Sequence, residues 1–202
     1  VIPEVVSVVS ERRPGGTEPF RMPEACPACG AAVHREPDQA VLRCTNGTGC
    51  PAQLRESLRH FASRRAMDIE GLGDETIADM VSLPFLVRDG ETRTLATVAD
   101  LYTLARDDLM VLKQLQDARD GVAADPRRKP TTRWAENLLA AIDRSRATSL
   151  PRLLFALGIR DVGESTAKAL ARHFGSIDRL LDVFHHRSIR HRRPAEAIGR
   201  FQ

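Results

Sequence analysis

The chain has 202 residues, of which 42% are hydrophobic, and its formal net charge is +3 at neutral pH. This composition is typical of one or two small globular domains, and the sequence indicates neither secretion nor a membrane partner. A charge so close to neutral excludes a uniformly basic body, so any nucleic-acid binding must come from local geometry. Arginine supplies 27 of the 30 basic residues, which suits bidentate phosphate contacts. Codon usage in a GC-rich genome explains the same bias equally well.

The chain begins with a run rich in β-branched side chains, Val1–Val9, which predicts a strand. A single strand buries neither of its faces, so we expect it to be the last strand of a domain that lies upstream. Residues 10–24 are rich in Arg, Pro, Gly and Glu and predict a linker.

All four cysteines lie within 25 residues, as a C-x2-C pair, fourteen intervening residues and a C-x5-C pair: Cys26, Cys29, Cys44 and Cys50. Two close pairs joined by a short polar loop can surround one tetrahedral ion, and four thiolates favour zinc. Four protein ligands leave no open coordination position, so the predicted zinc is structural. Two disulfides and an iron–sulfur centre are the alternatives. With four cysteines available, we expect His34 to be an exposed loop residue.

From Ala52 onward the hydrophobic residues recur at helical spacing. One apolar stripe predicts the first helix: Leu54, Leu58, Phe61 and Ala62. Several arginines lie off this stripe, among them Arg64 and Arg65. They belong either to a solvated helix face or to a phosphate-binding surface.

A turn with two glycines follows this helix, Gly71-Leu72-Gly73, and predicts a helix-hairpin-helix unit. Both glycines allow a positive φ and leave the backbone N–H groups uncovered. We expect Asp74 to be the N-cap of the next helix. Uncovered N–H groups beside a helix N-terminus suit a phosphate. A plain helix–helix turn is the alternative, because the G-x-G pattern alone is weak.

The hairpin pattern recurs over residues 158–163, between a helix expected from Ser149 to Leu157 and one expected over Glu164–Phe174. Gly175 is the expected C-cap of the second of these helices. Asp161 replaces the first glycine of the earlier hairpin and places a negative charge near the predicted phosphate. The candidate backbone and side-chain contacts of this second hairpin are Gly158, Arg160 and Gly163.

The region between the two hairpins is less regular. Helices are predicted over Asp107–Leu115 and Thr132–Arg146, and residues 116–131 between them predict a mobile loop. A fourth helical unit is expected to begin at Asp178–Phe184. It runs into a basic segment, residues 185–193, for which the sequence suggests a solvated tail and leaves the role open.

Together these motifs resemble the C-terminal half of bacterial NAD-dependent DNA ligases. The matching segments are Cys26-Pro27-Ala28-Cys29-Gly30, Arg43–Gly47, Cys50–Leu54, His60–Gly73 and Ala156–Gly163. Val1-Ile2-Pro3 resembles the end of the OB-fold domain of that family. The resemblance covers roughly residues 1–175 and is most specific through the cysteine segment and the first hairpin.

The resemblance implies a mainly α fold in three parts. Residues 1–20 are the expected end of an OB-fold with its linker, residues 21–51 a four-cysteine zinc finger, and residues 52–202 a helix-hairpin-helix DNA-binding domain with an incomplete last repeat. The implied DNA contacts are Arg64, Arg65, Gly71, Gly73, Gly158, Arg160 and Gly163. The implied partner is nicked double-stranded DNA, bound by a monomer in the bacterial cytoplasm, in association with the nucleoid.

The parent enzymes use NAD and Mg²⁺ to seal nicks during replication and repair, and the resemblance places both sites outside this chain. Their adenylation motif, Lys-x-Asp-Gly, is absent here. The three lysines all stand in other contexts: Lys113, Lys129 and Lys168. We therefore expect the chain alone to be inactive as a ligase, because it lacks the nucleophile that attacks NAD. The alternatives are a non-catalytic zinc and helix-hairpin-helix scaffold in repair or recombination, and a zinc-stabilised protein-interaction module.

Overall fold

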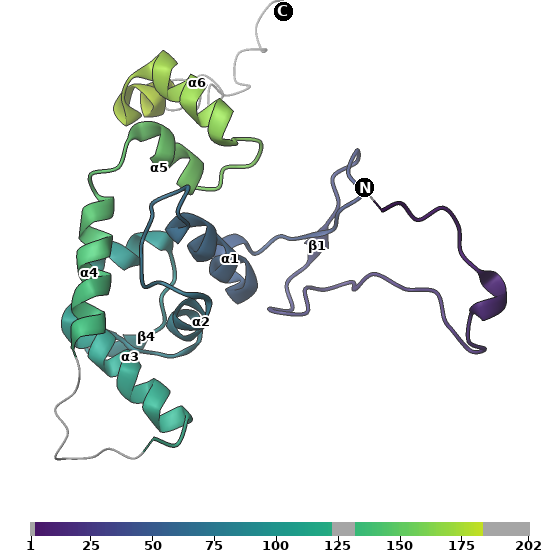
Figure 1. The fold of residues 1–202 in the computed structure, drawn as a ribbon, viewed down its shortest axis with the longest axis horizontal. Coiled ribbons are helices and arrows are strands. Elements are labelled where there is room, and N and C mark those ends of the chain that lie inside the picture. Colours follow the sequence, from purple (N-terminus) through teal and green to yellow (C-terminus); the bar gives the residue numbers. More distant parts are fainter. Residues whose placement is uncertain (1–2, 123–131, 184–202) are drawn as a thin grey trace, which may run out of the picture. The chain divides into compact units, whose positions relative to one another are not determined.

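The computed structural model describes residues 3–122 and 132–183 (Figure 1). The chain divides into two compact units, residues 1–46 and residues 47–202. The fold is mostly helical, as the sequence predicted. In the part of the chain that the structure describes, no helix is long and apolar enough to cross a membrane.

The first unit has little regular structure. A short 3-10 helix, Ser10–Arg12, precedes two antiparallel strands, β1 (Val33–His34) and β2 (Arg43–Cys44), in which Val33 lies opposite Cys44. His34 is exposed, as expected, but it lies in β1 and not in a loop.

The strand predicted over Val1–Val9 is not formed in its described part, residues 3–9. Val5 and Val6 are 88% and 91% exposed there. A strand needs a neighbour for its backbone hydrogen bonds and a surface to bury its side chains. This segment has neither among the described residues of its unit, so its β-branched composition does not produce a strand.

The second unit begins with the first helix-hairpin-helix element. A 3-10 turn at Gly47–Gly49 leads into α1 (Pro51–Ala62), and the hairpin leads into α2 (Asp74–Ser82). Pro51 occupies the first turn of α1, where its missing N–H costs nothing. The predicted apolar stripe of α1 is buried: Leu54, Leu58, Phe61 and Ala62.

A small β-hairpin and a 3-10 helix follow α2, and neither was predicted from the sequence. Strands β3 (Leu86–Arg88) and β4 (Glu91–Arg93) are joined by Asp89 and Gly90, which have φ of 54° and 80°. Two successive positive φ angles are typical of a tight hairpin turn. The 3-10 helix, Val98–Thr103, starts with a capping box in which the Asp100 carboxylate accepts from the backbone N–H of Thr97.

The remaining helices are α3 (Arg106–Arg119), α4 (Arg133–Ser145), α5 (Leu150–Ala156) and α6 (Glu164–Phe174). Helices α3 and α4 pack side by side, as do α5 and α6 (Figure 1). Gly175, with φ of 73°, ends α6 as predicted. Residues 177–183 are helical, and the rest of the predicted fourth unit and the 185–193 segment lie outside the described residues.

Helix α3 is longer than predicted, because residues 116–119 of the expected loop form its last turn. The side chains of Gln116 and Arg119 both donate to the carboxylate of Asp79, which is 6% exposed in α2. A buried carboxylate without donors is costly, so these contacts stabilise the additional turn. Residues 123–131 of the expected loop lie outside the described part.

The main hydrophobic core joins α1 to α4 and receives Ala156 from α5. Its largest fully buried side chains include Phe85, Leu58 and Ile77, each of which stabilises the fold by about 1.5–3 kcal/mol through burial. A second, smaller cluster around Leu154 and Ala167 joins α5 to α6.

Candidate metal centre and nucleic-acid interface

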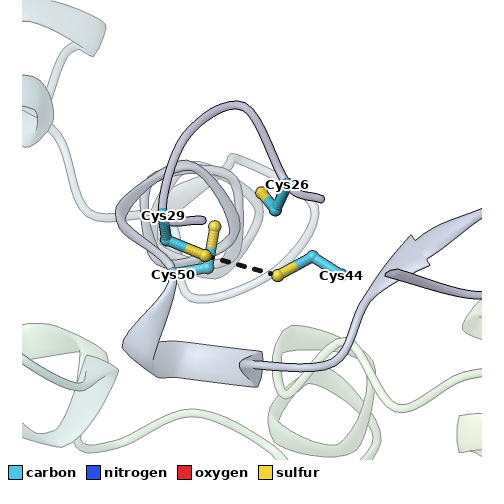
Figure 2. A group of neighbouring side chains, drawn as sticks. All are labelled: Cys26, Cys29, Cys44 and Cys50. Carbon is cyan, nitrogen blue, oxygen red and sulfur yellow. Dashed lines mark hydrogen bonds between the residues drawn. The ribbon is translucent and has the colours of Figure 1, made fainter. Parts of the chain in front are cut away.

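The four cysteine sulfurs lie together, all within 4.8 Å of one another (Figure 2). The Sγ atoms of Cys29 and Cys44 are 3.5 Å apart. Zinc–sulfur bonds of about 2.3 Å in a tetrahedron separate the sulfurs by about 3.8 Å, whereas a disulfide separates them by about 2.05 Å. None of the four forms a disulfide. The arrangement therefore fits one tetrahedral ion and excludes two disulfides.

Local backbone contacts place each sulfur. The N–H of Gly30 donates to the carbonyl of Cys26 at 2.8 Å and closes the turn that carries the first pair. Cys44 ends β2, and Cys50 is the N-cap residue of α1, with its N–H donating to the carbonyl of Gly47 at 3.1 Å. Three short-range structures thus bring together cysteines that are up to 24 residues apart in the sequence.

The thiols affect one another's ionisation. Backbone N–H groups of Ala28 and Cys29 lower the pKa of Cys26 to about 7. The backbone N–H of Asn46 favours the thiolate of Cys44, but burial together with the Cys29 and Cys26 side chains raises its pKa to about 11. Thiolates this close repel one another unless a cation lies between them. A divalent, thiophilic ion such as zinc is the chemical complement of this cluster.

The two glycines of the first hairpin have different backbone conformations. Gly71 has φ of 87°, in the left-handed region that favours glycine. Gly73 has φ of −81°, so it does not use the positive φ that glycine allows, and it is itself the N-cap of α2. The prediction of an Asp74 N-cap is therefore wrong. Gly73 takes the cap position because its extended ψ turns the chain into the helix, which leaves Asp74 as the first helical residue.

A shallow hollow is lined by residues 71–76 of this turn and the start of α2. The first N–H groups of a helix have no intrahelical acceptor and carry the positive end of the helix dipole. Two acidic residues, Asp74 and Glu75, lie in the first turn of α2, and the carboxylate of Asp74 is paired with the guanidinium of Arg59 in α1 at 2.9 Å. The hollow therefore has the geometry that suits a phosphate oxygen.

The second hairpin repeats the backbone conformation of the first. Three positions have matching φ: Asp68 (55°) with Gly158 (63°), Gly71 (87°) with Asp161 (64°), and Gly73 (−81°) with Gly163 (−80°). Glycine and aspartate are thus exchanged at the two left-handed positions. Asp is among the few residues that tolerate this conformation. The replacement of the first glycine by Asp161 consequently preserves the hairpin.

The structure places the arginines singled out by the sequence analysis at the surface around the hairpins. Arg64 and Arg65 lie in the turn between α1 and the first hairpin, and both are exposed. The Nη1 of Arg65 lies 3.5 Å from the carboxylate of Glu164 at the start of α6, an exposed ion pair between the two helix-hairpin-helix elements. Arg160 is half-exposed in the second hairpin, with its Nε 3.8 Å from the carboxylate of Asp161.

One arginine beside the first hairpin was not singled out by the sequence analysis. Arg152 of α5 donates to two carbonyls of the turn before that hairpin, those of Arg64 and Ala66. Every residue has a carbonyl, so a partner of this kind leaves no pattern in the sequence. Helical spacing alone suggests an ordinary partly exposed arginine.

Comparisons with known proteins agree with this architecture. Residues 25–52 match the NAD-dependent DNA ligase C4 zinc finger domain, and residues 152–186 match a helix-hairpin-helix motif. The chain is 50% identical over 183 residues to a DNA ligase of Methylococcus capsulatus, covering 91% of this chain and 24% of that protein. It is 44% identical over 220 residues to a DNA ligase of Stenotrophomonas maltophilia, covering 88% and 26%.

A DNA ligase of Alkalilimnicola ehrlichii is 43% identical over 183 residues, covering 91% of this chain and 24% of that protein. The chain thus spans about a quarter of the length of these curated relatives. The match over residues 25–52 contains all four clustered cysteines, which identifies the cluster as a structural zinc centre. The chain therefore carries a zinc finger domain like that of NAD-dependent DNA ligases and a helix-hairpin-helix motif, and over about nine-tenths of its length it is similar to proteins named DNA ligase.

Proposed function

We propose that this chain is the part of an NAD-dependent DNA ligase that holds nicked duplex DNA by its backbone while the nick is sealed. Relatives named DNA ligase, aligned over about nine-tenths of the chain, support this role. The proposal places the protein on chromosomal DNA in the bacterial cytoplasm, as a monomer. NAD and Mg²⁺ act elsewhere in the enzyme, because no lysine of this chain stands in a Lys-x-Asp-Gly motif.

The observation that carries the proposal is that two hairpins in the second unit, residues 47–202, have the same backbone conformation. Each hairpin ends in a glycine N-cap, Gly73 or Gly163, with a new helix directly behind it. N–H groups at such a turn bind phosphate oxygens through hydrogen bonds and the helix dipole. Contacts of this kind do not read bases, so the binding is independent of DNA sequence. That property suits an enzyme that meets nicks anywhere in a genome.

The exposed arginines near the hairpins add positive charge to these backbone contacts. We assign Arg64 and Arg65 to the first contact region and Arg160 to the second, beside Gly71 and Gly158 of the respective hairpins. Each phosphate that is neutralised releases counterions from the DNA, so the affinity should fall steeply with salt.

The proposed ligands of the zinc ion are Cys26, Cys29, Cys44 and Cys50, and its role is structural. Residues 25–50 have only two short strands and little apolar core of their own. Metal binding therefore supplies most of the free energy that folds this segment. We retain the expected organisation, with an OB-fold end and linker over 1–20, the zinc finger over 21–51 and the DNA-binding domain over 52–202.

The test is the affinity of the zinc-loaded 202-residue chain for a nicked duplex and for an intact duplex of the same sequence, over a series of salt concentrations. We expect micromolar or tighter binding at low salt, with log K falling linearly against log salt. A second series, after chelation and confirmed zinc loss, should give weaker binding. Affinity that does not depend on salt would instead indicate a protein-interaction module.

The coding sequence upstream of Val1 separates the ligase from a non-catalytic scaffold. An in-frame Lys-x-Asp-Gly motif followed by an OB-fold supports the ligase. A start codon directly before Val1 would favour a scaffold in repair or recombination.

A further inference from the structure

Arg152 joins the second helix-hairpin-helix element to the first. It is the third residue of α5, and its Nε donates to the carbonyl of Ala66 while its Nη2 donates to the carbonyl of Arg64, both at 2.7 Å. These carbonyls belong to the turn, residues 63–67, that leads from α1 into the first hairpin. Ala66 is fully buried, so its carbonyl has little access to water and depends on a protein donor.

The chemistry of this contact is specific to arginine. The guanidinium is planar and presents several N–H groups in a fixed fork, so one side chain can serve two carbonyls whose relative position is set. A lysine ammonium carries the same charge as a single point at the end of a flexible chain. It cannot fix two acceptors in this geometry.

Two further contacts connect the same elements. The Nε2 of His60 in α1 donates to the carbonyl of Phe155 in α5 at 2.8 Å, and the two rings meet edge to face with centroids 4.8 Å apart. A hollow of about 430 Å³ lies beside them, lined by both rings and by Gly158 of the second hairpin. These polar contacts add to the apolar attachment of α5, whose Ala156 belongs to the main core and whose Phe155 packs against it.

We infer that Arg152 is a positioning residue that sets the spacing and orientation of the two hairpins, so that both can bind phosphates of one duplex at the same time. This inference rests on the proposed DNA binding. When two weak sites are linked rigidly, binding at one raises the effective concentration at the other, and the gain disappears when the geometry no longer permits both to bind. Loosening the Arg152 contact should therefore remove one hairpin from the DNA while leaving each hairpin formed.

The experiment uses the zinc-loaded 202-residue chain and three variants. Arg152→Gln removes the charge and the fork, and Arg152→Lys keeps the charge but removes the fork. Arg106→Gln is the matched control: it removes one positive charge from a half-exposed side chain at the start of α3. Duplex affinity is measured over a salt series, at a temperature well below the melting point of every variant.

We expect both Arg152 variants to bind about 10-fold more weakly at low salt. The slope of log K against log salt should fall in magnitude by about 0.9 for each DNA phosphate that the variant no longer neutralises. Arg106→Gln should keep the wild-type slope. A merely structural role would lower the melting temperature without changing the slope, and that result overturns the inference. Wild-type binding by Arg152→Lys overturns it too, because charge rather than geometry would then be responsible.

Amide NMR spectra provide a second readout that does not depend on Arg152→Gln being folded. In the wild type, we expect signals of residues 69–73 and 159–163 to shift together as duplex is added. In Arg152→Lys the amide signals of the two hairpins should shift at different DNA concentrations. If they still shift together, the inference is overturned. If the wild type has no salt-sensitive affinity, the proposed function fails and the inference with it. If the wild type binds duplex with salt-sensitive affinity and the Arg152 variants bind equally well, the inference about Arg152 is refuted while the proposed function stands.

Discussion

Gly71 and Asp161 occupy the same position in two hairpins and share a left-handed backbone, with φ of 87° and 64°. A residue with a Cβ is strained in this conformation by about 1–2 kcal/mol, and Asp reduces that cost through local hydrogen bonding of its short side chain. The hairpin shape is therefore kept while a negative charge is added beside the second N-cap, Gly163. The two proposed phosphate sites are alike in backbone and different in charge.

Asp161→Asn should strengthen duplex binding. Asn tolerates the left-handed backbone as Asp does, and the Asp161 carboxylate is 91% exposed, so the substitution removes the charge without disturbing the hairpin. Lower repulsion of a phosphate should raise the affinity about 2–5-fold at low salt and less as salt increases. Fluorescence anisotropy with a labelled duplex measures the effect.

Asp107→Asn is the matched control for this prediction, because Asp107 is 92% exposed in α3 and far from the hairpins in the sequence. It should leave the affinity unchanged. Weaker binding by Asp161→Asn would contradict the prediction and would mean that Asp161 acts by holding Arg160, which lies 3.8 Å away.

Gly73→Ala should weaken DNA binding without much change in the stability of the fold. Gly73 has a negative φ, and no atom lies within 4 Å of the position that a Cβ would take, so the change should alter the free energy of unfolding by under about 1 kcal/mol. A methyl group at the mouth of the hollow keeps a phosphate away from the backbone, so we expect affinity to fall several-fold. Urea denaturation and duplex titration measure the two quantities.

Gly71→Ala is the informative contrast, because its φ of 87° strains any residue with a Cβ. It should cost about 1–2 kcal/mol of stability. Gly163→Ala repeats the Gly73 test in the second hairpin, with φ of −80° and equally open space. Unchanged affinity in both N-cap variants would show that these turns do not contact phosphate.

The pair formed by Arg88 and Asp108 should make the helical unit sensitive to acid. Two guanidinium nitrogens of Arg88 donate to the two carboxylate oxygens at 2.8 Å, and the backbone N–H of Ala105 donates to the same carboxylate. These contacts, chiefly that of Arg88, lower the pKa of Asp108. Its value in the unfolded chain is about 3.9, so folding favours the ionised form.

The stabilisation from Asp108 is accordingly complete above about pH 5 and is lost as the pH falls through its lowered folded-state pKa. Asp108→Asn should cost about 2–3 kcal/mol at pH 7, because it leaves a half-buried guanidinium without its partner. Between pH 5 and pH 3 the free energy of unfolding should fall less steeply in the variant than in the wild type. Equal slopes in denaturant titrations at several pH values would contradict this assignment, and Asp107→Asn again serves as the exposed control.

Zinc removal should unfold residues 25–50 and leave the helical core in place. Zinc binding and folding of a small four-cysteine unit are coupled, with apparent free energies of about 10–16 kcal/mol, whereas the main core is built from residues of α1 to α5 without any cysteine. After chelation, hydrogen exchange should accelerate in residues 25–50 and stay slow in the buried face of α4. Far-UV circular dichroism should change little.

Cys44→Ala should reproduce the effect of chelation, because it removes one ligand of four. Metal analysis should give one zinc per chain for the wild type and far less for the variant. Melting of the helices at the same temperature as zinc loss would show instead that the core depends on the metal.

Features that depend on near neighbours could be predicted from the sequence. The spacing of Cys26, Cys29, Cys44 and Cys50 predicted a cluster that the structure forms, because each pair is placed by a short turn. The helices around the second hairpin were predicted to within a residue or two, since an apolar stripe with Gly175 as a stop signal contains the necessary information. The strand over Val1–Val9 was wrong because composition does not supply a pairing partner.

Tertiary structure decided what depends on distant partners. The last turn of α3 forms because Gln116 and Arg119 meet Asp79, 37 and 40 residues earlier in the chain. The role inferred for Arg152 comes from two carbonyls 86 and 88 residues away. Local spacing specifies helices, turns and metal ligands because their contacts lie within one or two turns of the chain. Buried ion pairs and hydrogen bonds between elements become visible only when packing has brought those elements together.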